Sequence, residues 1–314
     1  MESKQQWLWR LYAAGILLLP VSLAFLQPHS GTAAQTSKDA GAGVVITDAS
    51  STDYTIYKGV VAEVLPKDGF QTKIVLGDVV PTLVADGIID TSKMQDLYKS
   101  RGGIPTNIMQ LLTQSSKTPL LVNADNASQL VNLLWPIGLS NKTAINENSP
   151  IAGKNVNNFA STGGWTLGKE ANGGTYFNSY PLVPLTASQE ARVLQIAENT
   201  YRPCCDNSTF FQDCNHGSAA LALVELGVAQ GLSDADIYRT VLDFNSFWFP
   251  QNYIQLGLYF KAVKHIDWKD VDPKIVLGKD YSSATGNYKI QAEVAKIPNL
   301  VPVQTSASGA KCGA

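Results

Sequence analysis

The stretch NHGSAALALVELGVAQ, residues 215–230, decides most about the fold of this chain. After His216 it holds one charged residue, Glu225, and is otherwise made almost entirely of Ala, Leu, Val, Gly and Ser. Ala and Leu are strong helix formers, and Gly231 follows directly, as glycine often does at a helix end. A helix that is apolar on every side lies in a protein interior. The stretch therefore predicts a buried helix around which other elements pack.

Further helix signals stand on both sides of this stretch. Thr186 and Gln189 form a capping-box pattern that opens a helix running to about residue 200, and Ser233 with Asp236 caps another that stops before Pro250. A fourth helix is predicted over residues 252–263. Upstream, apolar residues recur at three- and four-residue steps in segments 79–89, 94–98, 108–112 and 130–134. The pattern predicts a mainly α fold with a C-terminal helical bundle.

One part of the chain favours β-structure. Residues 54–64 and 72–76 are rich in β-branched and aromatic side chains, and the turn-forming stretch 66–69, Pro-Lys-Asp-Gly, separates them. We therefore predict a short β-strand pair near the N-terminus of the globular part.

Composition divides the chain into five segments. Residues 1–34 read as a signal peptide or signal anchor, and residues 35–52, rich in Ala, Gly, Ser and Thr, as a flexible tether. Residues 53–145 form a small mixed α/β region. Residues 146–185, dense in Asn, Gly and Ser, are an irregular connection, and residues 186–314 form a helical domain.

The N-terminal segment predicts export. Lys4 and Arg10 precede an uncharged, mostly apolar run over residues 11–26, and the small residues 32–34, Thr-Ala-Ala, suit signal peptidase. Because the positive flank stays in the cytoplasm, the chain beyond the apolar run lies on the outer face of the cytoplasmic membrane, in the periplasm or outside the cell. Cleavage and retention as a transmembrane helix both remain open. The membrane is thus the predicted partner, through this segment.

Charge argues against a nucleic-acid partner. The chain carries 24 Lys and Arg against 26 Asp and Glu, for a net charge of -2, and it has no long basic run. Nucleic-acid-binding proteins usually show a basic patch or stripe. No phosphate-binding glycine loop, nucleophile elbow or zinc-protease helix is present either, so no catalytic residue is assigned and enzymatic activity stays open.

Thiol and imidazole groups concentrate in one loop. Of four cysteines and three histidines in the chain, Cys204, Cys205, Cys214 and His216 lie within residues 204–216, and Cys312 lies near the C-terminus. The loop leads into the buried helix, for which Asn215 is the predicted N-cap. Unpaired N–H groups and the dipole at a helix N-terminus favour thiolate and neutral imidazole, the forms that bind metal.

Three interpretations of this loop stay open. The first is a soft-metal site for zinc or copper, with a structural or metal-handling role, in which Cys204, Cys205, Cys214 and His216 are ligands and Cys312 is a further candidate. In that site the two aspartates that flank the cysteines, Asp206 and Asp213, are candidate hydrogen-bond acceptors for His216. The second is a disulfide-stapled extracytoplasmic interaction or scaffold domain, because export implies an oxidising compartment. The third is a thiol–disulfide oxidoreductase.

The motifs YRPCC (201–205) and DCNHG (213–217), together with residues 245–250 and YSSA (281–284), resemble a family of exported, membrane-anchored bacterial proteins with a CC…CxHG loop. The resemblance extends over most of the chain after the tether. It implies export and gives the loop weight, but it brings no named activity.

Overall fold

The apolar stretch forms helix α8 (Asn215–Ala229), which is buried along nearly its whole length, as predicted. Its main neighbour is helix α5 (Ala127–Ser140), which is equally buried and carries Pro136 inside it. A Cβ atom on Gly138 of α5 would lie 2.1 Å from the carbonyl oxygen of Ser218. Only glycine therefore permits this separation of the two helices, which form the central pair of the core.

This computed structural model describes residues 54–302, which all belong to one compact unit with its own hydrophobic core. Such a unit can fold without the chain that precedes it. The predicted leader, tether and Cys312 lie outside the described residues. Within residues 54–302, no helix combines the length and the hydrophobicity needed to cross a bilayer.

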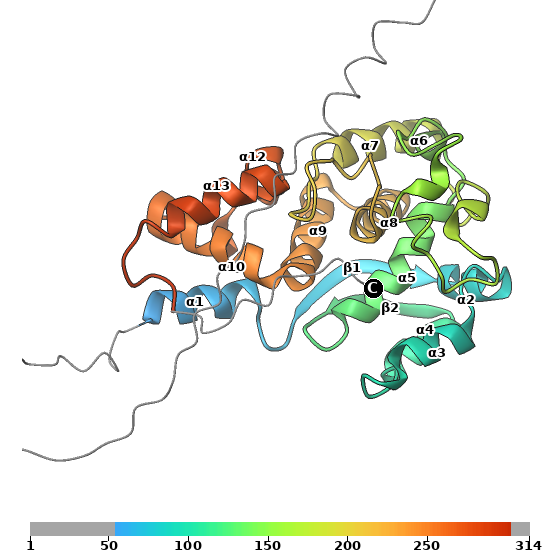
Figure 1. Ribbon diagram of the computed structural model, residues 1–314, viewed down its shortest axis with the longest axis horizontal. Helices are drawn as coiled ribbons and strands as arrows, with labels where there is room; N and C mark the ends of the chain where they lie inside the picture. Colours follow the sequence, from blue (N-terminus) through green and yellow to red (C-terminus); the bar gives the residue numbers. More distant parts are fainter. Residues whose placement is uncertain (1–53, 303–314) are drawn as a thin grey trace, which may run out of the picture. The chain divides into compact units, whose positions relative to one another are not determined.

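The elements succeed one another along the chain as shown in Figure 1. The remaining α-helices are α1 (Thr55–Val64), α2 (Val79–Ala85), α3 (Thr91–Lys99), α4 (Thr106–Thr113), α6 (Ala144–Glu147), α7 (Ala187–Glu198), α9 (Asp234–Trp248), α10 (Pro250–Tyr259), α11 (Pro273–Val276), α12 (Lys279–Ser282) and α13 (Ala284–Val294). The strands are β1 (Phe70–Gly77) and β2 (Ser116–Val122), and short 3-10 or π turns are η2 (Val156–Asn158), η3 (Gly173–Thr175), η4 (Phe260–Lys264) and η5 (Trp268–Asp270). The described part is thus mainly α, with a two-stranded sheet and a helical C-terminal region, as predicted.

The predicted strand pairing is wrong in detail. β1 contains the predicted strand 72–76, but its antiparallel partner is β2, and residues 55–64 form helix α1 instead of a strand. Val60 and Val64 are the buried residues of α1, one helical turn apart. Packing of this face against α10 outweighs the β-propensity of the segment, which is context-dependent. β2 itself, with Lys117 and Pro119, lacks a strong strand pattern.

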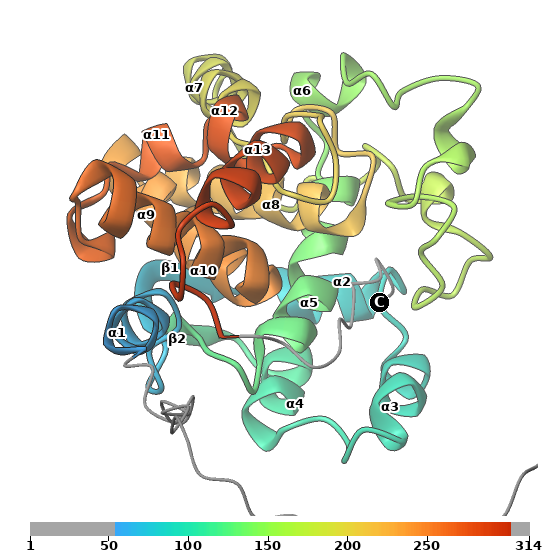
Figure 2. The same cartoon turned by 60° about the vertical axis from the view of Figure 1, so that its left-hand side comes forward.

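Two of the C-terminal helices, α7 and α9, start where their caps predict. Thr186 and Gln189 form the capping box of α7, and the Ser233 side chain accepts a hydrogen bond from the Asp236 N–H at the start of α9. The predicted fourth helix begins at Pro250 as α10 and continues into the π turn η4. Figures 1 and 2 both show α13 alongside α10, at the end of the bundle.

The irregular connection is fastened to the core by its tryptophan and by backbone hydrogen bonds. Trp165 is buried, packs edge-on against Trp135, and donates from Nε1 to the carbonyl oxygen of Ile88 over 3.1 Å. Farther along, the N–H groups of Leu182 and Val183 both donate to the side chain of Asn141. The connection thus belongs to the same core as the helices.

Candidate thiol and metal centre

The loop between α7 and α8 gathers three sulfur atoms. The Sγ atoms of Cys204, Cys205 and Cys214 all lie within 4.8 Å of one another, and those of Cys204 and Cys214 are 3.5 Å apart. A disulfide needs about 2.05 Å, and all three cysteines are free thiols in this structure. The loop therefore folds back so that its two ends bring the three sulfur atoms together. Each of the three cysteines is half-buried.

A buried arginine holds the loop in shape. Arg202 is fully buried, and its guanidinium lies inside the loop, where it donates to the carbonyl oxygens of residues 207, 208 and 211 over 2.9, 2.9 and 3.1 Å. It also pairs with the carboxylate of Asp213 and donates from Nε to Sγ of Cys214 over 3.2 Å. A Cβ on Gly217 would lie 2.6 Å from Cζ of Arg202. Glycine at 217 thus makes room for the guanidinium at the start of α8.

Cys214, and not Asn215, is the N-cap of α8. Its Sγ accepts a hydrogen bond from the N–H of Gly217 over 3.4 Å, and its backbone is extended. Hydrogen bonds from the thiols of Cys204 and Cys205 hold the pKa of the Cys214 thiol well below its usual range. The charge and the Nε–H of Arg202 lower this pKa further, against the opposing effect of burial. Among the three cysteines, Cys214 is therefore the one that releases its proton most readily.

The other two cysteines are the proton donors. The hydrogen bonds that the Cys204 thiol makes with Cys205 and Cys214, followed by burial, raise its pKa. For Cys205, the hydrogen bond with Cys204 lowers the pKa, but the one with Cys214 and burial together raise it to about 11. The three thiols thus differ in acidity, and Cys214, beside the positive charge of Arg202, has the lowest pKa.

His216 lies next to the cluster but is not part of it. Neither of its ring nitrogens joins the group of ligand atoms that lie within 4.8 Å of one another. Its ring packs against those of Trp248 and Phe249, with centroids 5.6 and 4.6 Å away, and burial lowers its pKa to about 4. Nδ1 is buried and has no hydrogen-bond partner among the described residues. Burial therefore favours the neutral form of the imidazole.

The two flanking aspartates do not contact His216. Asp206 accepts hydrogen bonds from the N–H and the hydroxyl of Thr285, each over 2.8 Å. Asp213 pairs with Arg202 and accepts from the Asn207 side chain over 2.6 Å. Both aspartates shape the loop that carries the sulfurs, and neither orients the imidazole.

Segments far apart in sequence meet at the cysteine loop. Nδ2 of Asn245 on α9 donates to the carbonyl oxygen of Tyr201 over 3.2 Å and to the hydroxyl of Tyr253 over 3.1 Å. The N–H of Ala284, the first residue of α13, donates to the carbonyl oxygen of Cys205 over 2.9 Å. The motifs quoted from residues 201–217, 245–250 and 281–284 thus form one site.

Sequence reasoning missed Arg202 and Tyr253. The available signal for Arg202 was its place directly before Pro203 and the paired cysteines, in a loop where a cation can offset the charge of a thiolate. The signal for Tyr253 was weaker, because a tyrosine in an aromatic-rich helix is ordinarily a core residue.

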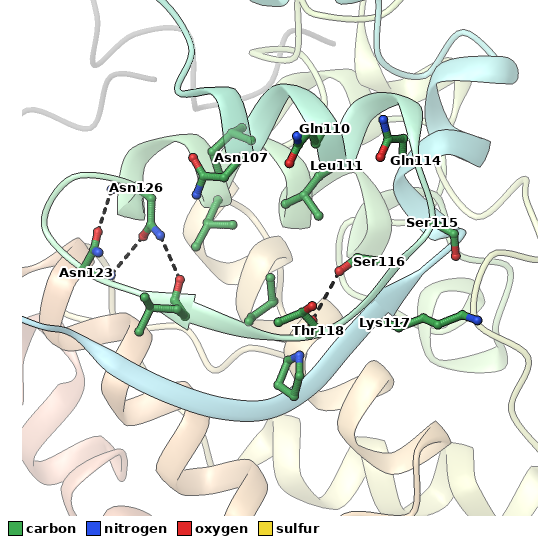
Figure 3. Close-up of a pocket in the computed structure, with 15 residues that line it drawn as sticks. Asn107, Gln110, Leu111, Gln114, Ser115, Ser116, Lys117, Thr118, Asn123 and Asn126 are labelled. Atoms are coloured by element: carbon green, nitrogen blue, oxygen red, sulfur yellow. Dashed lines mark hydrogen bonds between the residues drawn. The ribbon is translucent and has the colours of Figure 1, made fainter.

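A separate groove of about 420 Å³ lies between α4 and strand β2, away from the cysteines (Figure 3). Asn107 and Gln110 line it from α4 and Gln114 from directly after this helix, and Asn126 at one end donates a hydrogen bond to the carbonyl oxygen of Leu121. Its one charged lining residue is Lys117. Lys117 and Pro119 on this strand are residue types that protect a sheet edge from pairing. No cysteine, histidine or carboxylate lines the groove.

Comparison of the chain with protein-family models, with curated proteins and with solved structures finds no match in any of the three. Within the described part of the chain, the three cysteines form the group of potential metal ligands whose ligand atoms lie close together.

Proposed function

We propose that this is an exported, membrane-proximal protein that binds a soft metal ion, Zn²⁺ or Cu⁺, through Cys204, Cys205 and Cys214. The observation that carries the proposal is the convergence of three free Sγ atoms within 4.8 Å. Thiolates select Cu⁺ and Zn²⁺ over the hard cations that carboxylates prefer. No carboxylate belongs to the group of ligand atoms. Asp206 is bonded to Thr285, and Asp213 is paired with Arg202 and accepts a hydrogen bond from the Cys205 thiol over 3.8 Å.

Charge supports binding to the loop as it stands. Arg202 offsets one of the negative charges that three thiolates would bring together. Its guanidinium is held in this position because its other N–H groups donate to carbonyl oxygens of the loop. The metal would displace the protons of Cys204 and Cys205, as metal binding to thiols does. The site is thus arranged by residues other than its ligands.

The ligand count favours metal handling over a purely structural role. Structural zinc sites are closed by four protein ligands, whereas a site with three keeps one position open. His216 is our candidate for the fourth ligand in the loop, since its ring is neutral and its Nδ1 is unpartnered among the described residues. Cys312, outside the described residues, is a second candidate. A fourth ligand that binds reversibly would suit a protein that takes up the ion and transfers it to a partner.

The proposed location outside the cytoplasm rests on the N-terminal sequence. The positive leader, the apolar run over residues 11–26 and the small residues after it support export, and a retained anchor would keep the site near the outer face of the membrane.

Elemental analysis tests the metal. The protein is purified without chelator, and zinc and copper are measured beside single variants Cys204→Ser, Cys205→Ser and Cys214→Ser. We expect near-stoichiometric metal in the parent protein and a large loss in each variant. His216→Ala and Cys312→Ser then show which residue, if either, is the fourth ligand, by a smaller loss of affinity in a competition titration.

His265→Ala is the matched control, because His265 is an exposed histidine in the turn after η4 and takes no part in the cluster. Its metal content should equal that of the parent. Absence of metal from the parent protein, even after incubation with Zn²⁺ or Cu⁺ under reducing conditions, would rule the proposal out.

A second candidate function is thiol–disulfide exchange, favoured by the 3.5 Å between the sulfurs of Cys204 and Cys214. Cys214 stands at a helix N-terminus beside Arg202, which is the setting of nucleophilic cysteines, and Cys204 is placed to resolve a mixed disulfide. Equilibration with glutathione buffers and then mass spectrometry test it. A Cys204–Cys214 disulfide that forms and breaks near the potential of the compartment favours exchange, and a bond that resists reduction favours a stapled domain.

A further inference from the structure

The three sulfur atoms form a ligand set with a single kind of donor. Within residues 54–302, no imidazole nitrogen or carboxylate oxygen joins the group made by Cys204, Cys205 and Cys214. All three cysteines are free thiols, and each is half-buried, so a small solute can reach them from solvent. The loop therefore offers three thiols to one atom, with no fourth donor at a comparable distance in the described part of the chain.

The spacing of the closest pair is short for a tetrahedral ion. Zn–S bonds of about 2.3 Å at tetrahedral angles place two sulfur atoms about 3.8 Å apart. The Sγ atoms of Cys204 and Cys214 are 3.5 Å apart. A trivalent arsenic atom carries three ligands on one side and a lone pair on the other, with bond angles close to a right angle. Its sulfur ligands therefore lie closer together than those of zinc, and it needs no fourth ligand.

Charge also distinguishes the ions that three thiolates could hold. The complex carries two net negative charges with Cu⁺, one with Zn²⁺ and none with a trivalent metalloid. Arg202 donates to Sγ of Cys214, but its guanidinium is also paired with the carboxylate of Asp213. Net charge is costly for groups that are partly removed from water. A neutral complex avoids that cost and requires no further cation.

The sulfur atoms are held in place by groups that are not ligands. The guanidinium of Arg202 donates to the carbonyl oxygens of residues 207 and 208, each over 2.9 Å. On the other side, the carboxylate of Asp206 accepts from the N–H of Thr285, which fixes the chain next to Cys205. A site that is arranged before its ligand arrives loses less conformational entropy on binding. This arrangement favours an atom that must close three bonds at once.

We propose that the loop also binds trivalent metalloids of the arsenite class, through As–S bonds to Cys204, Cys205 and Cys214. Neutral arsenous acid, As(OH)₃, reacts with three thiols. Three S–As bonds form, three As–O bonds break, and each thiol proton leaves with a hydroxide as water. Arsenic stays trivalent and sulfur is not oxidised, so no oxidant or reductant is required. The inference rests on the cysteine cluster of the proposed function and extends its ligands from metal ions to a metalloid.

Intact-mass spectrometry counts the bonds. The chain is prepared in a Cys312→Ser background, so that the three loop cysteines are its only thiols. It is reduced with a phosphine, which offers arsenic no competing thiol, and incubated with sodium arsenite. We expect one adduct whose added mass equals one arsenic atom less three hydrogen atoms. An adduct that keeps a hydroxide on arsenic would show that only two sulfur atoms bind, and this result would overturn the three-bond site.

Cys205→Ser separates a three-thiol site from a two-thiol site. This variant should lose the three-bond arsenite adduct. It should still bind phenylarsine oxide, whose arsenic takes only two thiols, through Cys204 and Cys214. Circular dichroism checks that the variant is folded. His265→Ala is the matched control, because it changes an exposed residue outside the loop, and it should form the arsenite adduct as the parent does.

Zinc and copper binding by the same protein separates this inference from the proposed function. A protein that binds Zn²⁺ or Cu⁺ but forms no three-bond arsenite adduct would overturn the inference and leave the proposed function intact. An arsenite adduct without any metal binding would support the inference and contradict the proposed function. A preformed site also predicts that the adduct resists removal by a competing dithiol better in the folded protein than in urea. Equal resistance in both states would count against it.

Discussion

The guanidinium of Arg202 and the sulfur of Cys214 are joined by a hydrogen bond from Nε to Sγ of 3.2 Å, at a point where Arg202 has no exposed surface. The same guanidinium holds three loop carbonyls and the carboxylate of Asp213. The positive charge is therefore fixed at one place, directly before the buried helix. This arrangement favours the thiolate form of Cys214 in the folded structure, and the loop keeps its shape through groups other than the proposed ligands.

Replacing Arg202 by Lys should damage both stability and thiol chemistry. An ammonium group cannot reach the same set of acceptors, so buried carbonyls lose their partners, and we expect the free energy of unfolding to fall by about 3 kcal/mol. Alkylation of Cys214 at neutral pH should slow, because its thiolate loses a donor. Urea denaturation and iodoacetamide kinetics with mass mapping measure the two effects. Arg192→Lys, at a half-exposed ion pair with Asp234, should change stability by less than about 1 kcal/mol.

Adding one methyl group at Gly217 should displace the arginine. In Gly217→Ala the new Cβ would lie 2.6 Å from Cζ of Arg202, so the guanidinium must move, and we expect a loss of about 1–3 kcal/mol together with weaker metal binding. Gly59→Ala is the matched control, since Gly59 lies in α1 with no atom within 4 Å of the added Cβ. That change should stabilise the protein by about 0.5–1 kcal/mol, because alanine is the better helix former. In thermal unfolding, we therefore expect Gly217→Ala to lower the melting temperature and Gly59→Ala to raise it.

Asp206 should matter for metal affinity although it is not a ligand. Its carboxylate fastens the residue after Cys205 to Thr285 at the start of α13, and Asp206→Ala releases that end of the loop. We expect the dissociation constant for the ion to rise roughly tenfold, as the loss of supporting contacts does in other metal sites. Competition with a chromophoric chelator measures it. Asp68→Ala, at an exposed position in the turn before β1, should leave the affinity unchanged.

Asp243 should make stability depend on pH. Burial raises the pKa of this α9 carboxyl to about 7 from an ordinary value of 3.8. The folded protein then binds the proton more tightly than the unfolded chain, so the contribution is complete below about pH 4 and is lost as the pH rises through 7. The loss amounts to at most about 4 kcal/mol. Asp243→Asn should flatten the curve of unfolding free energy against pH between 4 and 7, whereas the exposed control Asp86→Asn should not.

The sequence predicted those features that depend on local chemistry. The buried helix α8, the caps at Thr186 and Ser233, and the closeness of three cysteines in one loop all depend on residue type and spacing. A short loop between two helices brings its ends together whatever the rest of the fold does. Local patterns of this kind are the features of a sequence from which structure is predicted most reliably.

The features that the sequence did not predict depend on distant contacts. Helix α1 carries a β-prone sequence, and it is helical because Val60 and Val64 pack against the bundle. The partner of β1 lies past three helices in the chain, and local propensity says nothing about it. The direction of the His216 ring is set by Trp248 and Phe249, which come from the end of the next helix. Each of these outcomes is decided by neighbours that spacing alone cannot identify.

The burial of α8 has a consequence for how fast an ion would leave. Amide hydrogens in a helix that is covered on all sides exchange only when the whole unit opens, so the backbone that carries Cys214 does not fray on its own. Cys204 and Cys205 stand instead on a loop that a few hydrogen bonds tie to the neighbouring helices, one from Ala284 and two from Thr285 on α13 and one from Asn245 on α9. Release would therefore begin at the paired cysteines, with Cys214 as the last contact. The residence time of the ion would track the opening of that loop, and it would stay uncoupled from global unfolding.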